Sequence, residues 1–495
     1  MSRRSNLITA LGAASAALVL QACSALPPVD APTLPSDASA EAPVPEQYPG
    51  AGDGESSAAI RWEQFFDDEH LIALIDRALE HNQELNVLLQ EIEIARNEVG
   101  ARRGEYLPSL DVRAGAGIDK VGRYTREGAV EESLPLDEER EKDFPEPLPD
   151  FLISADVSWE IDVWKRLRNA KKAAMLRYLA TREGRNFMVT HLVAELASAY
   201  YELMALDNRL SILDQMIDVQ RSALRAVKLQ KASARATELA VRRFEAEVLG
   251  NESQRYEIRQ QIVETENRIN FLAGRYPQRV ERASDGFDAR ALHAVQAGSP
   301  LALLQLRPDV RQAELELAAA ELDVRAARAR FYPALELSAG VGLHSAEGNS
   351  LFTTPESLVY GLAGDLVMPL LNRAAIRAEY RNATAEQLQA LWRYRQTVLN
   401  AFVEVANQLA RIDNLAQSYD RKRSQVEALT ESIAIADRLF TSARAEYTEV
   451  LFTQRDALES RMELVELRQQ QLSAQVRLYQ ALGGGYERGE YDAEG

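Results

Sequence analysis

Cysteine is nearly absent from this sequence, since Cys23 is the only one among 495 residues. A single cysteine excludes an internal disulfide framework and every zinc or iron–sulfur site that needs several cysteine ligands. The five histidines are scattered, and none lies in a two-histidine metalloprotease motif. His191 and Glu195 stand four residues apart, which we interpret as an ordinary helix face. No nucleophile and base occur together, so the sequence predicts neither an enzyme nor a bound cofactor or metal.

Basic residues are outnumbered by acidic ones. The chain has 57 Lys and Arg residues against 75 Asp and Glu residues, a formal net charge of −18. It has no basic stripe and no patch in which basic and aromatic residues interleave. These features argue against nucleic acid as a partner.

The first residues have the order of an export signal. Arg3 and Arg4 precede an apolar run at 7–20, as in a cleaved signal peptide. The tetrad Leu20-Gln21-Ala22-Cys23 resembles the bacterial lipobox, which implies cleavage before Cys23 and acylation of its thiol. The alternative is an ordinary signal in which the cysteine falls there by chance. Acyl chains would anchor the protein on a membrane, and this covalent lipid is the only attached group expected.

Glycine and proline are missing from long stretches. There is none between Arg373 and Leu482, and only Gly184 and Gly250 interrupt the stretch from Lys165 to Leu272. Ordinary globular helices are interrupted more often, so the sequence predicts very long helices. At about 1.5 Å per residue, the segment 373–440 would extend roughly 100 Å.

Apolar residues in these stretches recur every seven positions, which predicts helices that coil around one another with a left-handed twist. The repeats are Val189, Leu196, Leu203, Leu210, Ile217 and Leu224; Leu391, Val398, Val405, Ile412, Tyr419, Val426, Ile433 and Phe440; and Leu451, Leu458, Val465, Leu472 and Tyr479.

Four short segments, at 110–119, 154–163, 335–343 and 358–370, alternate apolar and polar residues with a period of two. This pattern is typical of strands with one apolar face, of about the length that crosses hydrocarbon. A soluble sheet packed on a helix would alternate in the same way. In the membrane interpretation the side chains facing lipid include Val157, Trp159, Ile161, Leu337 and Leu362, and those facing water are Asp156, Glu160 and Asp162.

Four strands cannot close a membrane barrel, because closure needs at least about eight strands and open edges are not tolerated in lipid. Several copies must then share one barrel. Two copies would leave the interior filled by side chains, whereas three would leave room for a lumen. Three copies are therefore favoured, although strand counting does not exclude other numbers.

The chain also contains an internal duplication. The segment 101–110 matches 326–335, each with a proline where a helix gives way to a strand, and 234–238 pairs with 443–447. Each half therefore has the order helix, strand, loop, strand, long helix, turn, long helix.

This order of elements, together with four motifs, resembles the TolC-like outer-membrane efflux protein family over nearly the whole mature chain. The match is to its lipoprotein branch, the OprM/NodT-type factors of RND efflux systems. The motifs are Trp62-Glu63-Gln64-Phe65-Phe66-Asp67, Ser158-Trp159-Glu160-Ile161-Asp162-Val163-Trp164, Leu306-Arg307-Pro308-Asp309-Val310-Arg311 and Leu478-Tyr479-Gln480-Ala481-Leu482-Gly483-Gly484-Gly485-Tyr486.

The resemblance implies an α+β membrane protein. Three chains would form a homotrimer whose strands make a shared 12-stranded β-barrel in the outer membrane, continued in the periplasm by an α-barrel of coiled hairpins. The helical tips would meet a periplasmic adaptor protein and an inner-membrane RND-type pump, and the chain would be lipid-anchored at the cell outer membrane.

The expected domains follow from these assignments. They are a lipoprotein signal peptide at 1–22, an acylated tether at 23–58, a first-repeat helix and equatorial region at 59–106, a first barrel hairpin with a long outer loop at 107–163, a first coiled hairpin at 164–272 with its tip near 232–238, an equatorial linker at 273–306, a second-repeat helix at 307–331, a second barrel hairpin at 332–370, a second coiled hairpin at 371–482 with its tip near 441–447, and a flexible tail at 483–495.

Two sets of site residues are implied by alignment with this family. Its inter-helix turns usually carry glycine, where this chain has Ala234 and Ala443; these residues, with Arg235 and Arg444, are the expected contacts to adaptor and pump. The periplasmic gate is expected at Thr448, Glu449 and Phe452. Phe452 also lies off the heptad seam, so it needs another partner. The alternative is that Phe452 packs between neighbouring hairpins and Glu449 is only solvated.

The sequence therefore predicts an outer-membrane exit duct of a tripartite efflux system that passively conducts small molecules such as drugs or toxic compounds. The alternatives are the duct of a type I protein secretion system and a periplasmic coiled-coil scaffold lipoprotein that transports nothing. A scaffold would not need four strands with one uniformly apolar face.

Overall fold

The computed structural model describes residues 44–49, 56–133, 146–284, 286–287, 290, 295–369, 371, 373–442 and 444–486. The signal segment, Cys23 and Ala443 lie outside these residues. The chain divides into two compact units. Among the described residues, unit 1 comprises Ile94–Tyr178 and Glu316–Leu391, and unit 2 lies within Ser39–Glu93, Leu179–Leu315 and Trp392–Gly495.

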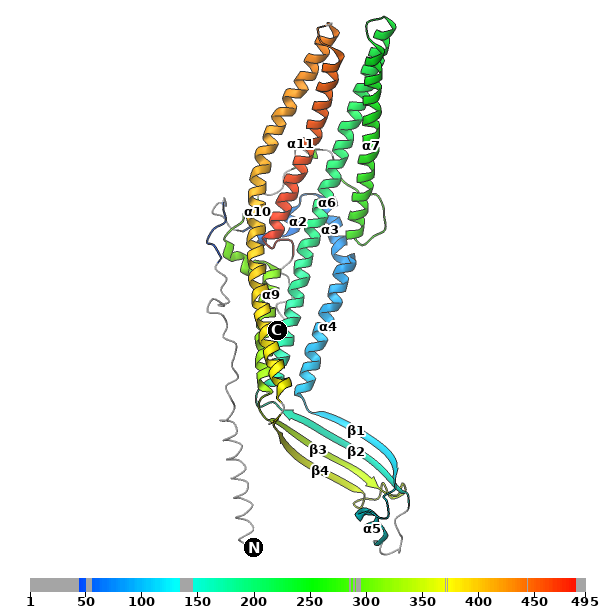
Figure 1. Ribbon diagram of the computed structural model, residues 1–495, viewed down its shortest axis with the longest axis vertical. Helices are drawn as coiled ribbons and strands as arrows, with labels where there is room; N and C mark the ends of the chain where they lie inside the picture. The colour runs from blue at the N-terminus through cyan, green and yellow to red at the C-terminus, as the bar shows by residue number, and fades with distance from the viewer. Residues whose placement is uncertain are drawn as a thin grey trace. The chain divides into compact units, whose positions relative to one another are not determined.

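Unit 1 contains a four-stranded antiparallel sheet in the order β1-β2-β3-β4 (Figure 1). The strands are β1 (Ser109–Asp119), β2 (Leu148–Ile161), β3 (Ala334–Ser345) and β4 (Leu358–Val367). Each overlaps one of the alternating segments of the sequence. β2 begins before the alternation at 154–163 because its first residues continue to pair with β1, as far as Asp119 opposite Leu148.

Each strand of this sheet is joined at one of its ends to a long helix. α4 (Gln83–Tyr106) ends before β1, and α9 (Pro308–Ala329) ends before β3. Pro108 and Pro333 follow these helix ends, where proline favours an extended backbone. α6 (Arg166–Ala232) begins after β2, α10 (Ala374–Thr441) begins after β4, and the short α5 (Arg126–Ser133) lies between β1 and β2.

Unit 2 consists of helices and connecting segments. Its own elements are η1 (Ser57–Ala59), α2 (Trp62–Phe65), α3 (Glu69–His81), α7 (Glu238–Leu272), η3 (Pro300–Ala302), α8 (Leu303–Leu306) and α11 (Tyr447–Ala481). α6 and α10, of 67 and 68 residues, continue into it from unit 1. Their length agrees with the scarcity of glycine and proline. Among the described residues, no helix is both long and apolar enough to cross a membrane.

The core of unit 2 lies where α2, α3, α6, α7 and α11 pack together. Its largest fully buried side chains include Phe65, Tyr200, Tyr201 and Tyr479. The rings of Phe65 and Tyr479 stack with centroids 4.2 Å apart. Many residues of the seven-residue repeats are buried, as the coiled pattern predicts. They include Leu196, Leu203, Ile217, Leu391, Val398, Val405, Leu451, Leu458, Val465, Leu472 and Tyr479.

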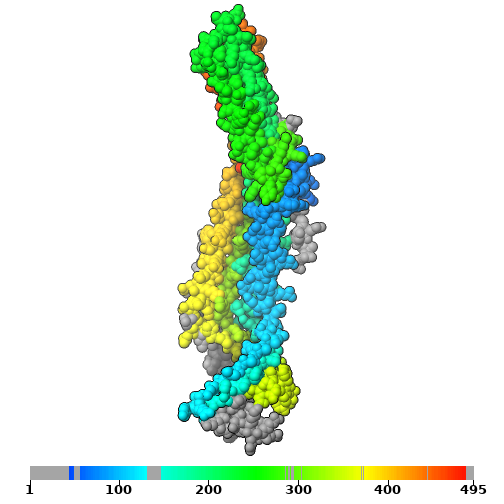
Figure 2. Space-filling model, turned by 90° about the vertical axis from the view of Figure 1, so that its right-hand side faces the viewer, coloured from blue at the N-terminus to red at the C-terminus, as the bar shows by residue number. Residues whose placement is uncertain are grey.

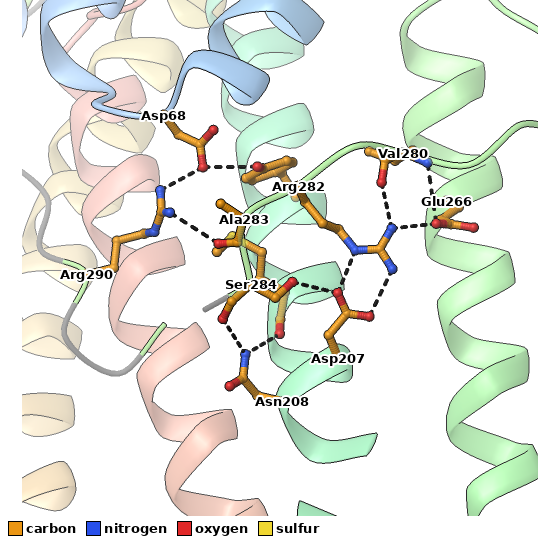
Figure 3. A network of polar contacts seen from close by, with 11 residues as sticks. Asp68, Asp207, Asn208, Glu266, Val280, Arg282, Ala283, Ser284 and Arg290 are labelled. Carbon is orange, nitrogen blue, oxygen red and sulfur yellow. Dashed lines mark hydrogen bonds and ion pairs between the residues drawn. The ribbon is translucent and has the colours of Figure 1, made fainter. Parts of the chain in front are cut away.

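A polar network fastens the segment after α7 to this core (Figure 3). Arg282 donates to Asp207 on α6 and to Glu266 on α7. Asp68, the N-cap of α3, accepts hydrogen bonds from the Tyr200 hydroxyl at 3.0 Å and from Arg290 at 2.7 Å. Buried charges need such partners, so this network determines the path of the chain between α7 and η3.

Part of the expected tether at 23–58 is packed rather than free. Tyr48 is 3% exposed, and its ring stacks on Phe402 of α10 with centroids 5.1 Å apart. Ser57 donates its backbone N–H to the Gln296 carbonyl, and its hydroxyl accepts from the Gln296 N–H. The composition of the segment does not predict these contacts, because a single aromatic residue in an otherwise polar segment can pack against the core.

Tyr48 offers a test of this attachment. Its hydroxyl is buried and has no hydrogen-bond partner among the described residues, and burial raises the pKa of Tyr48 above its ordinary value. Tyr48→Ala should lose about 2 kcal/mol of packing, so limited proteolysis near this residue should accelerate by roughly thirtyfold. Tyr48→Phe keeps the ring and should be cleaved no faster than the wild type. Equal cleavage of all three proteins would show that the ring does not hold the segment.

Candidate functional site

The register of the sheet places the alternating apolar residues of all four strands on one face, whereas Leu152, Val359 and Val367 lie on the other. Leu110 lies opposite Val157, and Trp159 lies opposite Leu337. Directly opposed residues share a face, so these pairs extend one surface across the sheet. Leu362 belongs to it and is 81% exposed in the single chain. The side chains that the sequence predicts to face lipid all share it; they are Val157, Trp159, Ile161, Leu337 and Leu362.

The other face of the sheet is polar and acidic. Asp111 lies opposite Asp156, and Glu336 lies between Glu160 on β2 and Asp365 on β4. Like charges in opposed positions repel one another. Contact with water, which has a high dielectric constant, weakens this repulsion. The two faces of the sheet therefore suit different surroundings, one apolar and one aqueous.

The position of Asp162 contradicts the prediction made from the sequence pattern. The sequence pattern predicts that it faces water on the acidic side of the sheet, but it lies after β2 and is 6% exposed. Its carboxylate accepts the N–H groups of Leu167 at 3.1 Å and Arg168 at 2.9 Å. It therefore stabilises the first turn of α6, where unpaired N–H groups favour an acidic partner.

Aromatic side chains gather where the helices join the sheet. The Trp159 indole N–H donates to the Tyr106 carbonyl at 3.2 Å, and the Trp164 N–H donates to the Pro333 carbonyl at 2.8 Å. The Trp164 and Tyr332 rings stack with centroids 4.7 Å apart. Figure 2 shows the surface of β1, cyan, continuing from that of α4, and every residue of β1 is exposed.

The first helical tip contains an alanine in a backbone conformation that favours glycine. α6 ends at Ala232, and Ala234 has φ of 52°. Its N–H donates to the Lys231 carbonyl at 2.9 Å, and the Arg235 N–H donates to the Gln230 carbonyl at 2.8 Å. This pair of bonds is the Schellman pattern that ends a helix. The expected partner contacts Ala234 and Arg235 thus occupy an ordered turn.

The second tip lies between α10 and α11, with Ala443 outside the described residues. The Arg444 N–H donates to the Leu439 carbonyl at 2.8 Å, the same spacing as at the first tip. At the start of α11, Thr448 is half-buried and Glu449 is exposed. Phe452 is 49% exposed, and the Arg455 guanidinium lies 5.3 Å from its ring centroid. The structure thus brings the three predicted gate residues together on two turns of one helix.

An apolar cluster joins the two tips. It contains Val227 of α6, Phe244 of α7 and Leu451 of α11. Leu451 is buried whereas its neighbour Phe452 is not, which agrees with the position of Phe452 off the seven-residue seam. Below this cluster the Asn251 amide donates to the buried Gln220 at 2.7 Å. Sequence reasoning missed this polar pair, and only its place within the apolar repeat could have indicated it.

The other polar groups considered in the sequence have structural partners. Glu195, four residues after His191, accepts a hydrogen bond from Arg268 at 3.0 Å. Within the described residues, no group of three or more His, Cys, Asp or Glu side chains is arranged to hold a metal ion. The polar network around Asp68 and Arg282 was also missed, because its members are far apart in the sequence.

The backbone at Ala234 can be tested by substitution. A left-handed alanine costs about 1 kcal/mol relative to glycine, so Ala234→Gly should stabilise the first tip. The measurement is hydrogen exchange of the Arg235 amide, which should slow by roughly fivefold. Ala232→Gly is the matched control: Ala232 is the last residue of α6, so glycine there should speed exchange. Effects of the same sign for both variants would contradict this assignment.

Comparison with known proteins adds three findings. The chain matches the family model described as outer membrane efflux protein over residues 74–275 and 300–484. It is 29% identical over 476 residues to the pyoverdine export outer membrane protein OpmQ of Pseudomonas aeruginosa, covering 96% of each chain. It is also 27% identical over 474 residues to the solvent efflux pump outer membrane protein SrpC of Pseudomonas putida, covering 95% of this chain and 97% of that one.

Solved structures share the fold. A crystal structure of a membrane protein from Pseudomonas aeruginosa superposes with a TM-score of 0.81 at 26% identity, covering 92% of this chain and 99% of that one. The open state of the Neisseria gonorrhoeae MtrE outer membrane channel superposes with a TM-score of 0.80 at 23% identity, covering 90% of this chain and 97% of that one.

Proposed function

Because this chain belongs to the outer membrane efflux protein family, we propose that it is the exit duct of a tripartite efflux system for small molecules. It is an outer-membrane channel of an efflux pump and resides in that membrane. OpmQ is a pyoverdine export protein and SrpC belongs to a solvent efflux pump, so family membership alone does not determine the cargo. Drugs or other toxic compounds fit the proposed role.

The observation that carries this proposal is the two-faced sheet. An apolar face that is open in the single chain suits lipid, and an acidic face suits a water-filled lumen. The two outer strands, β1 and β4, each pair with only one neighbour, and lipid does not tolerate open edges. Three copies that join β4 to β1 would close a 12-stranded barrel with room for solutes. A scaffold protein would need neither face.

Leu362 and Ala363 test the two-faced barrel. They are neighbours in β4, both exposed in the single chain, and they point to opposite faces. Leu362→Arg should cost about 2–4 kcal/mol on a lipid face and strongly reduce the yield of trimer from membranes. Ala363→Arg faces the lumen and should reduce it far less. Equal yields from the two variants would contradict the barrel.

The helices of unit 2 complete the proposed duct. Three copies of the α6–α7 and α10–α11 hairpins form a periplasmic tunnel, and its tips contact the adaptor and an RND-type pump. The contact residues are Ala234, Arg235, Ala443 and Arg444. The gate lies at Thr448, Glu449 and Phe452, where three exposed phenylalanine rings make an apolar constriction and three glutamates favour cations.

Conductance measurements in planar bilayers test this gate. Phe452→Ala should raise the single-channel conductance, because it removes the apolar constriction. Glu449→Gln should weaken the preference for cations. Tyr256→Ala on α7, which removes another exposed aromatic ring (63% exposed), is the control and should change neither property. Unchanged conductance and selectivity in both gate variants would show that the gate does not lie at these residues.

Two further features complete the proposal. Acylation of Cys23 anchors the mature N-terminus in the outer membrane, in addition to the sheet. The relatives are channel proteins, and the chain is proposed to conduct passively, with no enzymatic activity and no cofactor beyond the covalent lipid.

A further inference from the structure

Four helix ends meet the sheet of unit 1 at one end. β1 and β3 begin there, and β2 and β4 end there, because neighbouring strands are antiparallel. The register shows this directly: Ser109 lies opposite Ser158, and Ala334 lies opposite Val367. The C-terminal ends of α4 and α9 and the N-terminal ends of α6 and α10 therefore gather beside one another.

These helix ends are strongly basic, although the chain as a whole is acidic. We call the segments 96–106, 165–172, 325–333 and 373–381 the basic collar. Together they carry 14 Lys and Arg residues and 3 Glu residues, a net charge of +11 in a chain of net charge −18. Each segment contributes at least three basic residues, so the charge surrounds the junction rather than lying on one helix.

Part of this charge is neutralised by the chain itself. Arg166 pairs with Glu160 of the acidic face, and Arg168 pairs with Asp162, which caps α6. Arg102 pairs with Glu98 and Glu105 on its own helix. Eight basic side chains have no hydrogen-bond or ion-pair partner in the part of the chain that the structure describes. They are Arg103, Lys165, Lys171, Lys172, Arg325, Arg328, Arg377 and Arg381.

The position of Lys165 gives a second, independent observation. Its φ is 62°, a left-handed conformation in which glycine or asparagine is ordinarily found. The bonds from Asp162 to the N–H groups of Leu167 and Arg168 fix the turn around it. The side chain of Lys165 is exposed, as is that of Lys172 in the second turn of α6. A backbone conformation unusual for lysine is thus kept at a cation that has no partner among the described residues.

The neighbouring aromatic residues indicate what the collar faces. Trp159 lies on the apolar face, and Trp164 stacks on Tyr332 at the same junction. Trp and Tyr in such places lie at the boundary between hydrocarbon and water. The collar begins on the helical side of these rings, at the level of lipid headgroups. Anionic headgroups attract Lys and Arg at that level.

We propose that the basic collar binds anionic phospholipids of the leaflet that faces the helices. This inference depends on the proposed function only in that the sheet must cross the membrane. Basic residues directed toward the lumen would meet the acidic face of the sheet, as Arg166 does through Glu160. The eight unpaired cations are the ones left for headgroup phosphates. Such binding would fix the depth of the sheet in the membrane.

Titration of the purified full-length protein with phosphatidylglycerol or phosphatidylethanolamine, followed by native mass spectrometry, tests this proposal. The collar variant combines Lys165→Gln, Lys172→Gln, Arg377→Gln and Arg381→Gln. Its apparent affinity for phosphatidylglycerol should fall by on the order of tenfold or more, and added salt should weaken wild-type binding. Binding of phosphatidylethanolamine should not change.

The matched control removes four exposed basic residues of unit 2 whose side chains have no hydrogen-bond or ion-pair partner among the described residues: Lys228→Gln, Arg243→Gln, Arg411→Gln and Arg421→Gln. It has the same net charge as the collar variant and should bind phosphatidylglycerol like the wild type. Equal loss in both variants, or no loss in the collar variant, would overturn the proposal.

Channel recordings in bilayers of phosphatidylethanolamine alone separate this inference from the proposed function. The collar variant should conduct with wild-type ion selectivity. If it instead changes ion selectivity and still binds phosphatidylglycerol normally, the collar lines the lumen and the lipid proposal is wrong. If the wild type forms no pores in any bilayer, the proposed function fails whatever the lipid result.

Discussion

Backbone hydrogen-bonding groups along the outer sides of β1 and β4 have no neighbouring strand among the described residues of one chain. In lipid, each such group would cost several kcal/mol, so the apolar face can enter a membrane only if these edges are paired. Pairing β4 of one copy with β1 of the next satisfies them. In the proposed trimer, the number of copies, the enclosed lumen and the helical tunnel all depend on this one constraint.

Much of this arrangement could be predicted from the sequence, because periodicity reports directly on local structure. The absence of glycine and proline from 373–482 predicts the long helices, and the alternation around Trp159 predicts β2. The alanine in place of glycine at Ala234 indicates an unusual turn, whose φ of 52° the structure supplies. Family resemblance then identifies the channel, which no single pattern could have done.

Other features depend on contacts between distant residues, and the sequence could not show them. Asp162 continues the alternation of apolar and polar residues, but in the structure it caps α6. Alternation with a period of two does not show at which residue a strand ends. Tyr48 lies in a polar segment, yet it is held by Phe402, far along the chain. Likewise, the basic collar is divided among four segments, so a search for one basic stripe misses it. The start of α6 and the end of α9 come together only through the register of β2 with β3.

Cysteine scanning of β2 tests the two-faced sheet most directly. The chain has one natural cysteine, Cys23, whose thiol is expected to be acylated, so single cysteines at positions 153–161 would be unique reporters. In native outer membranes, a water-soluble maleimide should label positions 156, 158 and 160 and leave 153, 155, 157, 159 and 161 unlabelled, the alternation that the register requires; position 154 is left out because Ser154 is buried. Uniform labelling along β2 would contradict a membrane-spanning strand and, with it, the channel described here.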